Sequence, residues 1–412
     1  MKFTAAALAL LASTTLGTAF AAEGPVPPGA PVLDHVFVIM LENHGYNEIL
    51  NNPNAPFINA EYATKGVATN YYGVAHPSLT NYLETVGGSN FGVTNDHAPD
   101  WHSTTCTTAL ASGVPSNEAN PGLICPITGT GTETATTLLD FSNETTGQPG
   151  DINIDMIHSF PALTNISGKT IADQLVEAKK TWKTYQEFLP LSGADGMDYS
   201  NGFFTNKTDF SKSPASLGLS TSAIVQQYRS KHNPFVYFAS IQGTAVNGQI
   251  PGVEGFNGAN GLYADLATGK VPAFSFIAPG QCNDMHGQGN GGVFCNYDPA
   301  NNGTQSGLND ALIQQGDQSV QTIVTAIKAS PVWAKHRSAI VIVWDENDYS
   351  TAPITNQVML IVDKNYGQQH YISNRFYTHY SLLKSIESGL RLPCLNHACD
   401  HNVASMSDLF SR

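Results

Sequence analysis

Short apolar runs that alternate with helical patterns constrain the fold of this chain more than any other feature of its sequence. The apolar runs lie at residues 35–41, 180–185, 233–241, 272–278, 338–344 and 357–363. Between them, apolar residues spaced three and four positions apart predict helices at 170–180, 316–330 and 378–390. Strands that are apolar throughout are buried on both faces. The order therefore predicts an α/β fold with a central, mostly parallel sheet that helices cover on both faces.

One domain is expected to span residues 22–412, because no linker divides the chain. Residues 1–21 have the basic start, apolar core and small-residue cleavage site of a secretory signal peptide. Residues of about 95–160 lack periodicity and are rich in Thr, Ser, Gly, Asn and Pro, which predicts a loop-rich insertion. No later apolar run reaches the roughly 18 residues of a membrane-spanning helix. We therefore expect a secreted or periplasmic protein without a transmembrane segment.

The six cysteines of an exported chain predict disulfides, and six cysteines allow 15 pairings. Nearness in the sequence favours three pairs, of which the first would tie the insertion: Cys106 with Cys125, Cys282 with Cys295, and Cys394 with Cys399. The alternative, a metal site built from thiolates, is disfavoured because the chain has no CxxC pair.

The formal net charge of −14 argues against nucleic acid as a partner, because binding its phosphates requires Lys and Arg to displace counterions. The same charge leaves a phosphate-ester substrate open, because a bound metal ion can reverse the local field. The total charge therefore decides less than the chemistry of individual segments.

Two of the apolar runs end in the same way, with acidic residues directly after the last apolar position. Residues 35–41 are followed by Glu42 and Asn43, and residues 338–344 by Asp345 and Glu346. Ligand sites of open α/β sheets lie at the carboxyl ends of the strands. If the two strands are parallel neighbours, their carboxylates converge and require a cation or a proton. The alternative is that these residues cap helices or lie in solvated loops, which explains single acidic residues better than a matched pair of motifs.

Two further segments carry residues suited to phosphate chemistry. Ser78 follows Pro77 and precedes a helical pattern at 79–86, so it is either only an N-cap or a nucleophile facing a phosphoryl group at the helix N-terminus. Asp284 and His286 follow another apolar run and are two residues apart, which on an extended segment would place both side chains on one side. A chance spacing or a loop hydrogen bond explains that pair equally well. His379 is a weaker signal, because it also fits the start of a helix.

Seven segments, taken in order, carry a resemblance to a known family. They are "MLENHGYNEIL", "NAPFINAEYATKG", "HPSLTNYLETVGGSNFG", "HNPFVYFASI", "CNDMHG", "VIVWDEND" and "THYSLLKSIESGLRLPCL". Together they resemble the phosphoesterase family, which holds secreted acid phosphatases and bacterial phospholipases C and belongs to the alkaline phosphatase superfamily. The likeness covers most of residues 33–400 except the insertion, and it implies an alkaline-phosphatase-like sheet.

The resemblance also implies roles for individual residues. It implies that a catalytic divalent metal ion is bound by Glu42, Asn43, Ser78, Asp345 and Glu346. It further implies that the nucleophile, its companion and the phosphate-contacting imidazole are Ser78, Asn81 and His286, with Asp284 and His76 as additional phosphate-binding candidates and His44 adjacent without a role. Carboxylate, amide and hydroxyl ligands suit Ca²⁺, Mg²⁺ or Mn²⁺, whereas a histidine ligand would favour Zn²⁺ or Fe.

The expected function is a secreted, metal-dependent phosphatase that hydrolyses phosphate monoesters through a phosphoserine intermediate. One alternative is a phospholipase C, but that branch continues after "DEND" with glycine, aromatic residues and a D-H pair, whereas this chain has "YSTAPITN". The chain also has no basic amphipathic segment for a membrane surface. The other alternative is a non-catalytic secreted protein that binds metal or phosphate in the same pocket.

Overall fold

The computed structural model describes residues 23–93, 166, 168–187, 228–242, 252–287, 310–347 and 355–411. The predicted signal peptide and the predicted insertion at about 95–160 lie outside these ranges. The expected pairings of Cys106 with Cys125 and of Cys282 with Cys295 also involve residues outside them. These predictions therefore stay predictions.

The described residues form an eight-stranded sheet in the order β5-β4-β6-β1-β7-β8-β2-β9. Its strands are β1 (His35–Leu41), β2 (Gly66–Ala68), β4 (Trp182–Gln186), β5 (Val253–Gly255), β6 (Phe274–Ala278), β7 (Ser338–Trp344), β8 (Leu360–Lys364) and β9 (Tyr371–Ser373). β5, β4, β6, β1 and β7 pair in parallel, and so do β2 and β9, whereas β8 runs antiparallel to both β7 and β2. This arrangement confirms the predicted mostly parallel central sheet. A separate parallel pair joins β3 (Tyr71–Tyr72) to β10 (Tyr377–Thr378).

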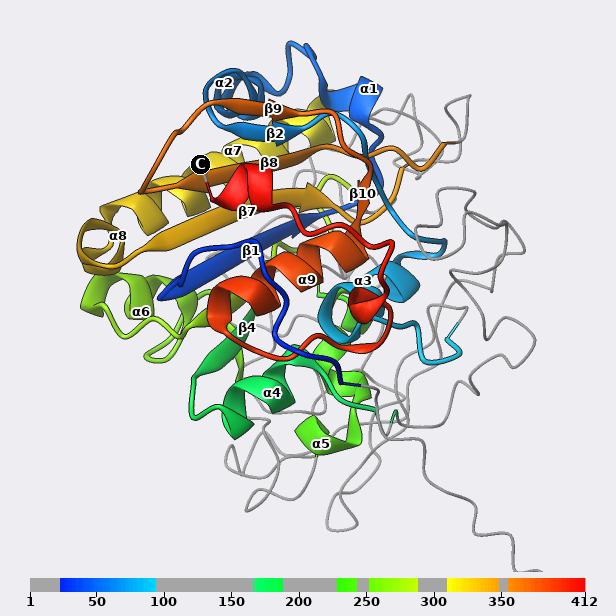
Figure 1. Ribbon diagram of the computed structural model, residues 1–412. Coiled ribbons are helices and arrows are strands. Elements are labelled where there is room, and N and C mark those ends of the chain that lie inside the picture. The colour runs from blue at the N-terminus through cyan, green and yellow to red at the C-terminus, as the bar shows by residue number, and fades with distance from the viewer. Residues whose placement is uncertain are drawn as a thin grey trace, which may run out of the picture.

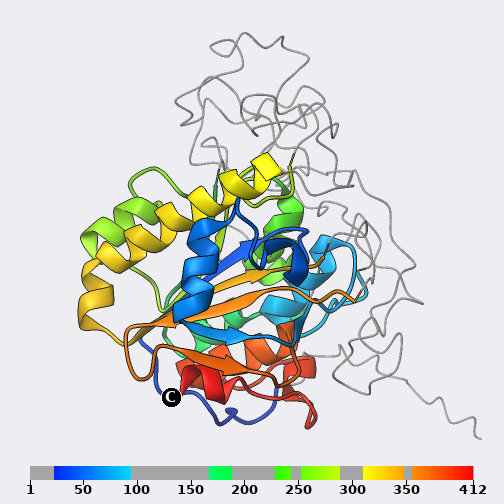
Figure 2. The same ribbon diagram turned by 90° about the horizontal axis from the view of Figure 1, so that it is seen from above.

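Helices cover both faces of the sheet, as Figures 1 and 2 show from two directions. On one face lie α2 (Pro56–Thr64), α6 (Leu262–Thr268), α7 (Asp310–Ala329) and α8 (Pro331–Lys335). On the other lie α3 (Ser78–Gly87), α4 (Ile171–Glu177) and α9 (His379–Leu390). The remaining helical segments are short: α1 (Tyr46–Ile49), η4 (Ser230–His232), η5 (Pro234–Tyr237), α5 (Ala239–Gln242), η9 (Asn396–Cys399) and α10 (Ser407–Phe410).

The central strands are apolar along their whole length because both of their faces are covered. From Val36 to Leu41 and from Ala339 to Trp344, every side chain has an exposed fraction of 0 %. Burying a side chain of this size contributes about 1.5–3 kcal/mol relative to leaving it in water. The core therefore holds β1 and β7 as immediate neighbours. Because the two strands are parallel, their carboxyl ends lie side by side.

One predicted strand is wrong. Residues 233–241 form the 3₁₀ segment η5 and the start of helix α5, with only an isolated bridge from Phe238 to Ile166. Pro234 has no N–H to give to a strand ladder, and the Val236 N–H bonds locally to Asn233 O at 3.3 Å. The large apolar side chains of the segment are buried nevertheless, and buried apolar runs of this length are also typical of strands. The helix predicted at 316–330 also begins earlier, at Asp310.

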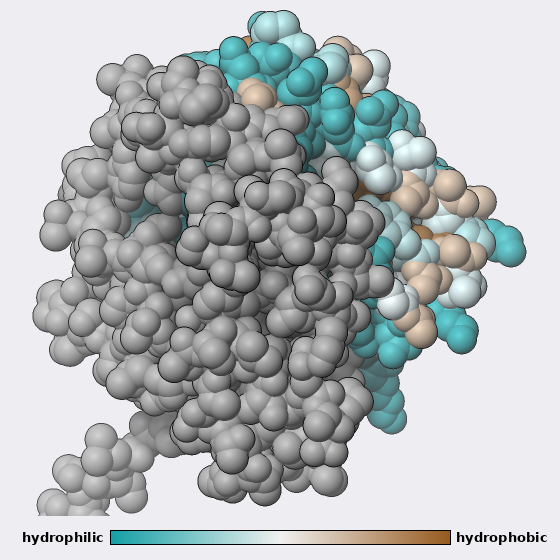
Figure 3. All heavy atoms as spheres, turned by 180° about the vertical axis from the view of Figure 1, so that it is seen from behind, coloured by the Kyte–Doolittle hydropathy of each residue, from teal (hydrophilic) through white to brown (hydrophobic). Residues whose placement is uncertain are grey.

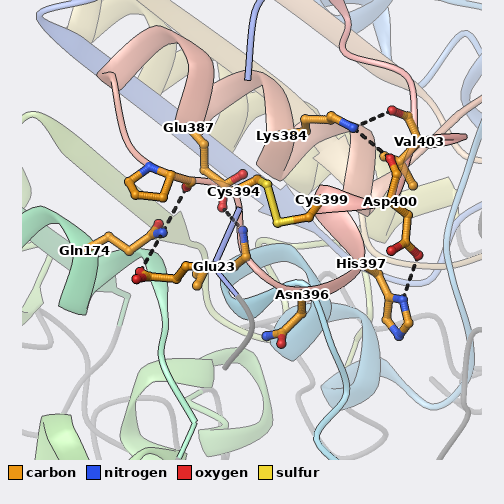
Figure 4. The surroundings of a disulfide bond; sticks show 12 residues. Glu23, Gln174, Lys384, Glu387, Cys394, Asn396, His397, Cys399, Asp400 and Val403 are labelled. Atoms are coloured by element: carbon orange, nitrogen blue, oxygen red, sulfur yellow. Dashed lines mark hydrogen bonds and ion pairs between the residues drawn. A yellow bond between two sulfur atoms is a disulfide. The ribbon is translucent and has the colours of Figure 1, made fainter. Parts of the chain in front are cut away.

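The C-terminal region is closed by a disulfide between Cys394 and Cys399, which confirms one of the three expected pairs. Figure 4 shows its surroundings: the first described residues lie against it, where the Gly24 N–H donates to Cys394 O at 3.0 Å. A Cβ atom on Gly24 would lie 2.5 Å from Cys394 Sγ. Only glycine therefore fits beside the disulfide without displacing it.

The described part of the surface in Figure 3 is mainly hydrophilic, with small, separate hydrophobic areas. Within the described residues, no helix is both long enough and apolar enough to cross a membrane.

Candidate active site

The carboxyl ends of β1 and β7 meet as the sequence predicts. The two strands are parallel and in register from His35 opposite Ser338 to Leu41 opposite Trp344. The next residues, Glu42 and Asp345, are both fully buried. The Asn43 N–H donates to Asp345 Oδ1 at 3.0 Å and so ties the two strand ends together. Asn43 has a φ of 57°, a left-handed conformation that asparagine tolerates better than most residues.

Ser78 connects the two acidic strand ends. Its hydroxyl lies 3.0 Å from Glu42 Oε2 and 3.3 Å from Glu346 Oε1. The prediction that Ser78 is the N-cap is wrong, because Pro77 has the extended conformation of the cap and Ser78 is the first residue of α3. Its side chain is therefore free of capping and is directed to the carboxylates. The N-terminus of α3, the positive end of the helix dipole, lies beside them.

Asn81, on α3, and His76, in the loop before α3, both contact the Glu346 carboxylate. Asn81 Nδ2 donates to Glu346 Oε2 at 3.0 Å, and His76 Nδ1 lies 2.8 Å from the same oxygen. Asn81 Oδ1 accepts the N–H groups of Val74 and Ala75 at 2.8 and 3.0 Å. The asparagine therefore fixes the loop that carries His76 relative to the carboxylate.

Asp284 and His286 lie at the same end of the sheet, but the segment that carries them is a turn and not extended. Met285 between them has a φ of 84°, and the His286 N–H donates to Asp284 Oδ1 at 2.8 Å. The backbone connects this turn to β1, because the Glu42 N–H donates to Asp284 O at 2.9 Å. The turn brings Asp284 and His286 to the site. The expectation of an extended segment, with both side chains on one side because they are two residues apart, is wrong.

His232 is a site residue that the sequence analysis missed. Its Nε2 lies 3.0 Å from Glu42 Oε1, and its Nδ1 lies 3.2 Å from Asp284 Oδ2. The Tyr82 ring stacks on the imidazole with a centroid distance of 5.3 Å and an angle of 8°. The segment "HNPFVYFASI" was noted only for its likeness to a family, and its histidine precedes a misassigned strand. Pro234, two positions after His232, argues against a strand and is the signal that could have drawn attention to this segment as a turn.

Two other histidines support the strand ends from behind. His44 Nδ1 lies 3.0 Å from Glu42 O. His379 begins α9, and its two ring nitrogens lie 2.7 Å from Asp345 O and 2.8 Å from the Tyr71 hydroxyl. Burial lowers the pKa of His379 to about 4, so its ring is neutral and donates one hydrogen bond to the Asp345 carbonyl.

The buried carboxyls raise one another's pKa values. Burial, with the nearby charge of Asp345, holds the pKa of Glu42 well above its usual range. Burial and the charge of Glu346 do the same for Asp345, and burial and the charge of Glu42 for Asp284. The positive charge of Lys231 acts in the opposite direction on Glu42 but does not cancel the effect. Without a cation, these carboxyls therefore hold protons more readily than exposed ones, because the site does not neutralise their full charge.

This donor set suits a hard divalent cation in its chemistry. Carboxylate oxygens from Glu42 and Glu346 lie beside the Ser78 hydroxyl, and Asp345 interacts with both glutamates. The buried Asp345 Oδ2 has no hydrogen-bond partner among the described residues. Such oxygens are the ligands that Mg²⁺, Ca²⁺ and Mn²⁺ prefer. In the described part of the chain, however, no three His, Cys, Asp or Glu side chains already converge as a formed metal cluster. Coordination would require these carboxylates to turn toward a common point.

Similar solved structures share 9–12 % sequence identity with this chain. One is a protein of the alkaline phosphatase superfamily from Vibrio parahaemolyticus, with a TM-score of 0.41 over 90 % of this chain and 69 % of the other. Another is a phosphonate monoester hydrolase from Silicibacter pomeroyi, with a TM-score of 0.38 over 92 % of this chain and 76 % of the other.

Curated relatives are similar along most of this chain. An acid phosphatase of Aspergillus fumigatus is 23 % identical over 93 % of this chain and 62 % of its own length. A phosphate-repressible acid phosphatase of Penicillium chrysogenum is 24 % identical over 94 % of this chain and 68 % of its own length. The chain thus spans about 62 % of the length of the Aspergillus relative.

The family model described as the phosphoesterase family matches residues 50–294. The matched region contains Ser78, Asn81, His232 and His286, whereas Glu42 and the pair Asp345–Glu346 lie on either side of it. Because the match covers more than half of the chain, the protein belongs to the phosphoesterase family, as its sequence motifs predict.

Proposed function

We propose that the protein is a metal-dependent phosphatase that hydrolyses phosphate monoesters, with Ser78 as the nucleophile. The observation that carries the proposal is the position of the Ser78 hydroxyl, at the start of α3 and within 3.0 and 3.3 Å of carboxylates from two adjacent strand ends. Membership of the phosphoesterase family and the similarity to fungal acid phosphatases support the type of reaction.

In the first step, the Ser78 oxygen, which Glu42 Oε2 orients at 3.0 Å, attacks phosphorus and its proton passes to solvent. The bond from phosphorus to the leaving alcohol breaks, and the alcohol oxygen takes up a proton from solvent. A water molecule then hydrolyses the phosphoserine, which releases phosphate and returns the hydrogen to Ser78. The N–H groups at the start of α3 would hold phosphoryl oxygens during both steps.

Glu42, Asn43, Ser78, Asp345 and Glu346 are the residues proposed to hold the divalent cation. When bound, the cation would neutralise charge on the phosphoryl oxygens and lower the pKa of a coordinated hydroxyl. Asn81 and His76 keep Glu346 in place through their bonds to its Oε2. His232 does the same for Glu42, and Asp284 in turn holds His232. His286 is proposed to contact the phosphoryl group.

The test compares hydrolysis of p-nitrophenyl phosphate and of p-nitrophenylphosphorylcholine by the purified protein, with and without a chelator. Ser78→Ala should lower kcat by at least ~10³-fold, since removing the nucleophile of a serine hydrolase costs up to ~10⁶-fold. Ser330→Ala is the matched control, because Ser330 also begins a helix but caps α8, away from the acidic strand ends. Full activity of Ser78→Ala would contradict the proposal, and preference for the choline diester would indicate a phospholipase C.

We also propose that the protein acts in an oxidising compartment outside the cytoplasm. The Cys394–Cys399 disulfide supports this location, because cytosolic thiols are kept reduced. Fractionation of the native host, with activity measured in the exported and cytoplasmic fractions, tests it. Activity found only in the cytoplasm would contradict it.

A further inference from the structure

The imidazole of His286 has two different neighbours at one of its nitrogens. His286 Nδ1 contacts Gln281 Nε2 and also lies 3.1 Å from the carbonyl oxygen of Gly287. An amide nitrogen can only donate, whereas a carbonyl oxygen can only accept. The two neighbours therefore favour opposite tautomers of His286. The Gln281 amide requires an unprotonated Nδ1, whereas the Gly287 carbonyl requires a protonated Nδ1.

Arg229 decides which way the Gln281 amide faces. Arg229 Nε donates to Gln281 Oε1 at 2.6 Å, and Gln281 is buried with an exposed fraction of 1 %. Turning the amide over would place its NH₂ group against the guanidinium N–H and would lose this charge-assisted hydrogen bond. The amide oxygen therefore stays on the arginine, and the NH₂ group faces His286.

We propose that Arg229 and Gln281 are positioning residues that fix His286 in the neutral tautomer with its hydrogen on Nε2. The Nδ1 lone pair accepts from Gln281, so Nε2 is the ring nitrogen that can donate a hydrogen bond. This inference deepens the proposed function, on which its catalytic consequence rests: His286 acts as a hydrogen-bond donor to the phosphoryl group and not as a base.

The surrounding contacts leave the tautomer as the main variable of this side chain. The backbone N–H of His286 donates to Asp284 Oδ1 at 2.8 Å. The centroid of the His286 ring lies 6.0 Å from that of His232, which contacts Glu42. The backbone and the neighbouring ring thus set where His286 lies, whereas Gln281 sets which nitrogen carries the hydrogen.

Nitrogen-15 NMR of the histidine rings in the full chain tests the tautomer directly, with His286→Gln used to assign the signals. Nδ1 of His286 is expected to resonate as an unprotonated imidazole nitrogen and Nε2 as a protonated one. In Gln281→Met, which is similar in size but has no donor, Gly287 should take over and move the hydrogen to Nδ1. A wild-type His286 with its hydrogen on Nδ1 would overturn the proposal, and so would an unchanged tautomer in Gln281→Met.

The kinetic readout follows from the loss of one donor to the phosphoryl group. Gln281→Met should lower kcat on p-nitrophenyl phosphate by about 10²–10³-fold, as removal of one such donor does elsewhere, with a much smaller change in KM. Gln315→Met is the matched control, because Gln315, on α7, donates to Asn283 Oδ1 at 2.8 Å in the turn that carries His286. Equal losses in the two variants would overturn the proposed role.

A second variant keeps the inference testable if Gln281→Met does not fold. Arg229→Met frees the amide to turn, so the His286 signals should shift toward a mixture of tautomers, and a pure Nε2–H tautomer would contradict the role of Arg229. Failure of the proposed function would look different. In that case wild-type protein would show the expected tautomer and its change in the variants, but would not hydrolyse phosphate esters.

Discussion

Two groups of buried carboxylates in this protein are balanced by different partners. Between α2, α7 and β8, Glu61 and Asp363 both bind Lys328, at 3.1 and 2.6 Å, and Asp363 also binds Lys65 at 3.3 Å. At the carboxyl end of the sheet, hydroxyl, amide and imidazole groups hold the carboxylates instead. The first group is matched in charge and joins three elements, whereas the carboxyls of the second group repel one another and favour a bound proton or cation. Excess charge in a buried position is what a cation-binding site needs and a structural site avoids.

The largest expected difference between the two groups is in catalysis. Glu42→Gln removes a charge but keeps the shape of the side chain, so the affinity for the divalent ion and kcat should each fall by more than ~10²-fold. This loss exceeds the one typical of substitutions at residues that only hydrogen-bond to metal ligands. The melting temperature without metal should not fall, because the substitution relieves repulsion from Asp345. Titration calorimetry, steady-state kinetics and thermal unfolding measure the three quantities.

Glu387→Gln is the matched control for that substitution. Glu387 is also fully buried, and burial holds the pKa of its carboxyl well above the usual range, but it bonds to the Leu395 N–H in the C-terminal region. Its variant should keep both metal affinity and kcat. A loss of metal binding in Glu387→Gln, or normal binding in Glu42→Gln, would remove the contrast between structural and functional carboxylates.

The charge-matched group should show the opposite pattern. Lys328→Met leaves Glu61 and Asp363 without the ammonium group that they share, and it should lower the free energy of unfolding by about 1–3 kcal/mol. Breaking a fully buried ion pair costs ~3–5 kcal/mol, and the expected loss is smaller here because Lys328 is partly exposed. Its kcat should stay unchanged. Urea unfolding of Lys328→Met and of Lys335→Met, an exposed lysine on α8, measures the difference. Equal stability of the two variants would contradict the structural role.

Stability without metal should depend on pH in a direction that the site sets. The pKa values of Glu42, Asp345 and Asp284 are raised by burial and by neighbouring charge. A raised pKa means that the folded state holds protons more tightly than the unfolded state. The stabilisation that these protons give is complete at pH values below the unfolded-state pKa, and it is lost as pH rises through the folded-state pKa. The chelated protein should therefore unfold at a higher temperature at pH 5 than at pH 8, by a few degrees per kcal/mol.

Glu42→Gln sharpens this measurement because it removes one of the coupled groups. The difference in melting temperature between pH 5 and pH 8 should shrink in the chelated variant. Added metal should reduce the difference in the wild-type protein and have little effect in the variant. A chelated wild-type protein that is more stable at pH 8 than at pH 5 would show that the acidic strand ends do not dominate its pH response.

The smallest expected effect comes from Lys364, next to the charge-matched group. Burial lowers the pKa of Lys364 to about 8, although its Nζ donates to Leu409 O at 2.9 Å. The folded state therefore binds fewer protons than the unfolded state between pH 8 and about 10.4, and stability should rise with pH over that interval. Lys364→Met should lose this rise, whereas Lys270→Met, at an exposed lysine, should keep it. Urea unfolding at a series of pH values measures the slope.

The sequence by itself determined the layers of the fold and most of the acidic site. Apolar runs such as 35–41 and 338–344 predict strands buried on both faces, and the residues after them are then expected at the carboxyl edge of a parallel sheet. Glu42 and Asp345 could therefore be predicted from a local pattern. Ser78 could be predicted as a residue at the start of a helix, although its position within that helix could not.

Only the tertiary structure decided which distant side chains complete the site. His232 meets Glu42 across 190 positions because it ends η4, directly before η5 turns where an apolar run suggested a strand. Arg229, Gln281 and His286 form a chain of contacts through the packing of two turns. Local patterns report which face of an element is buried, because burial follows the period of that element. They do not report the contacts between loops, because those depend on the relative positions of elements that are far apart in the sequence.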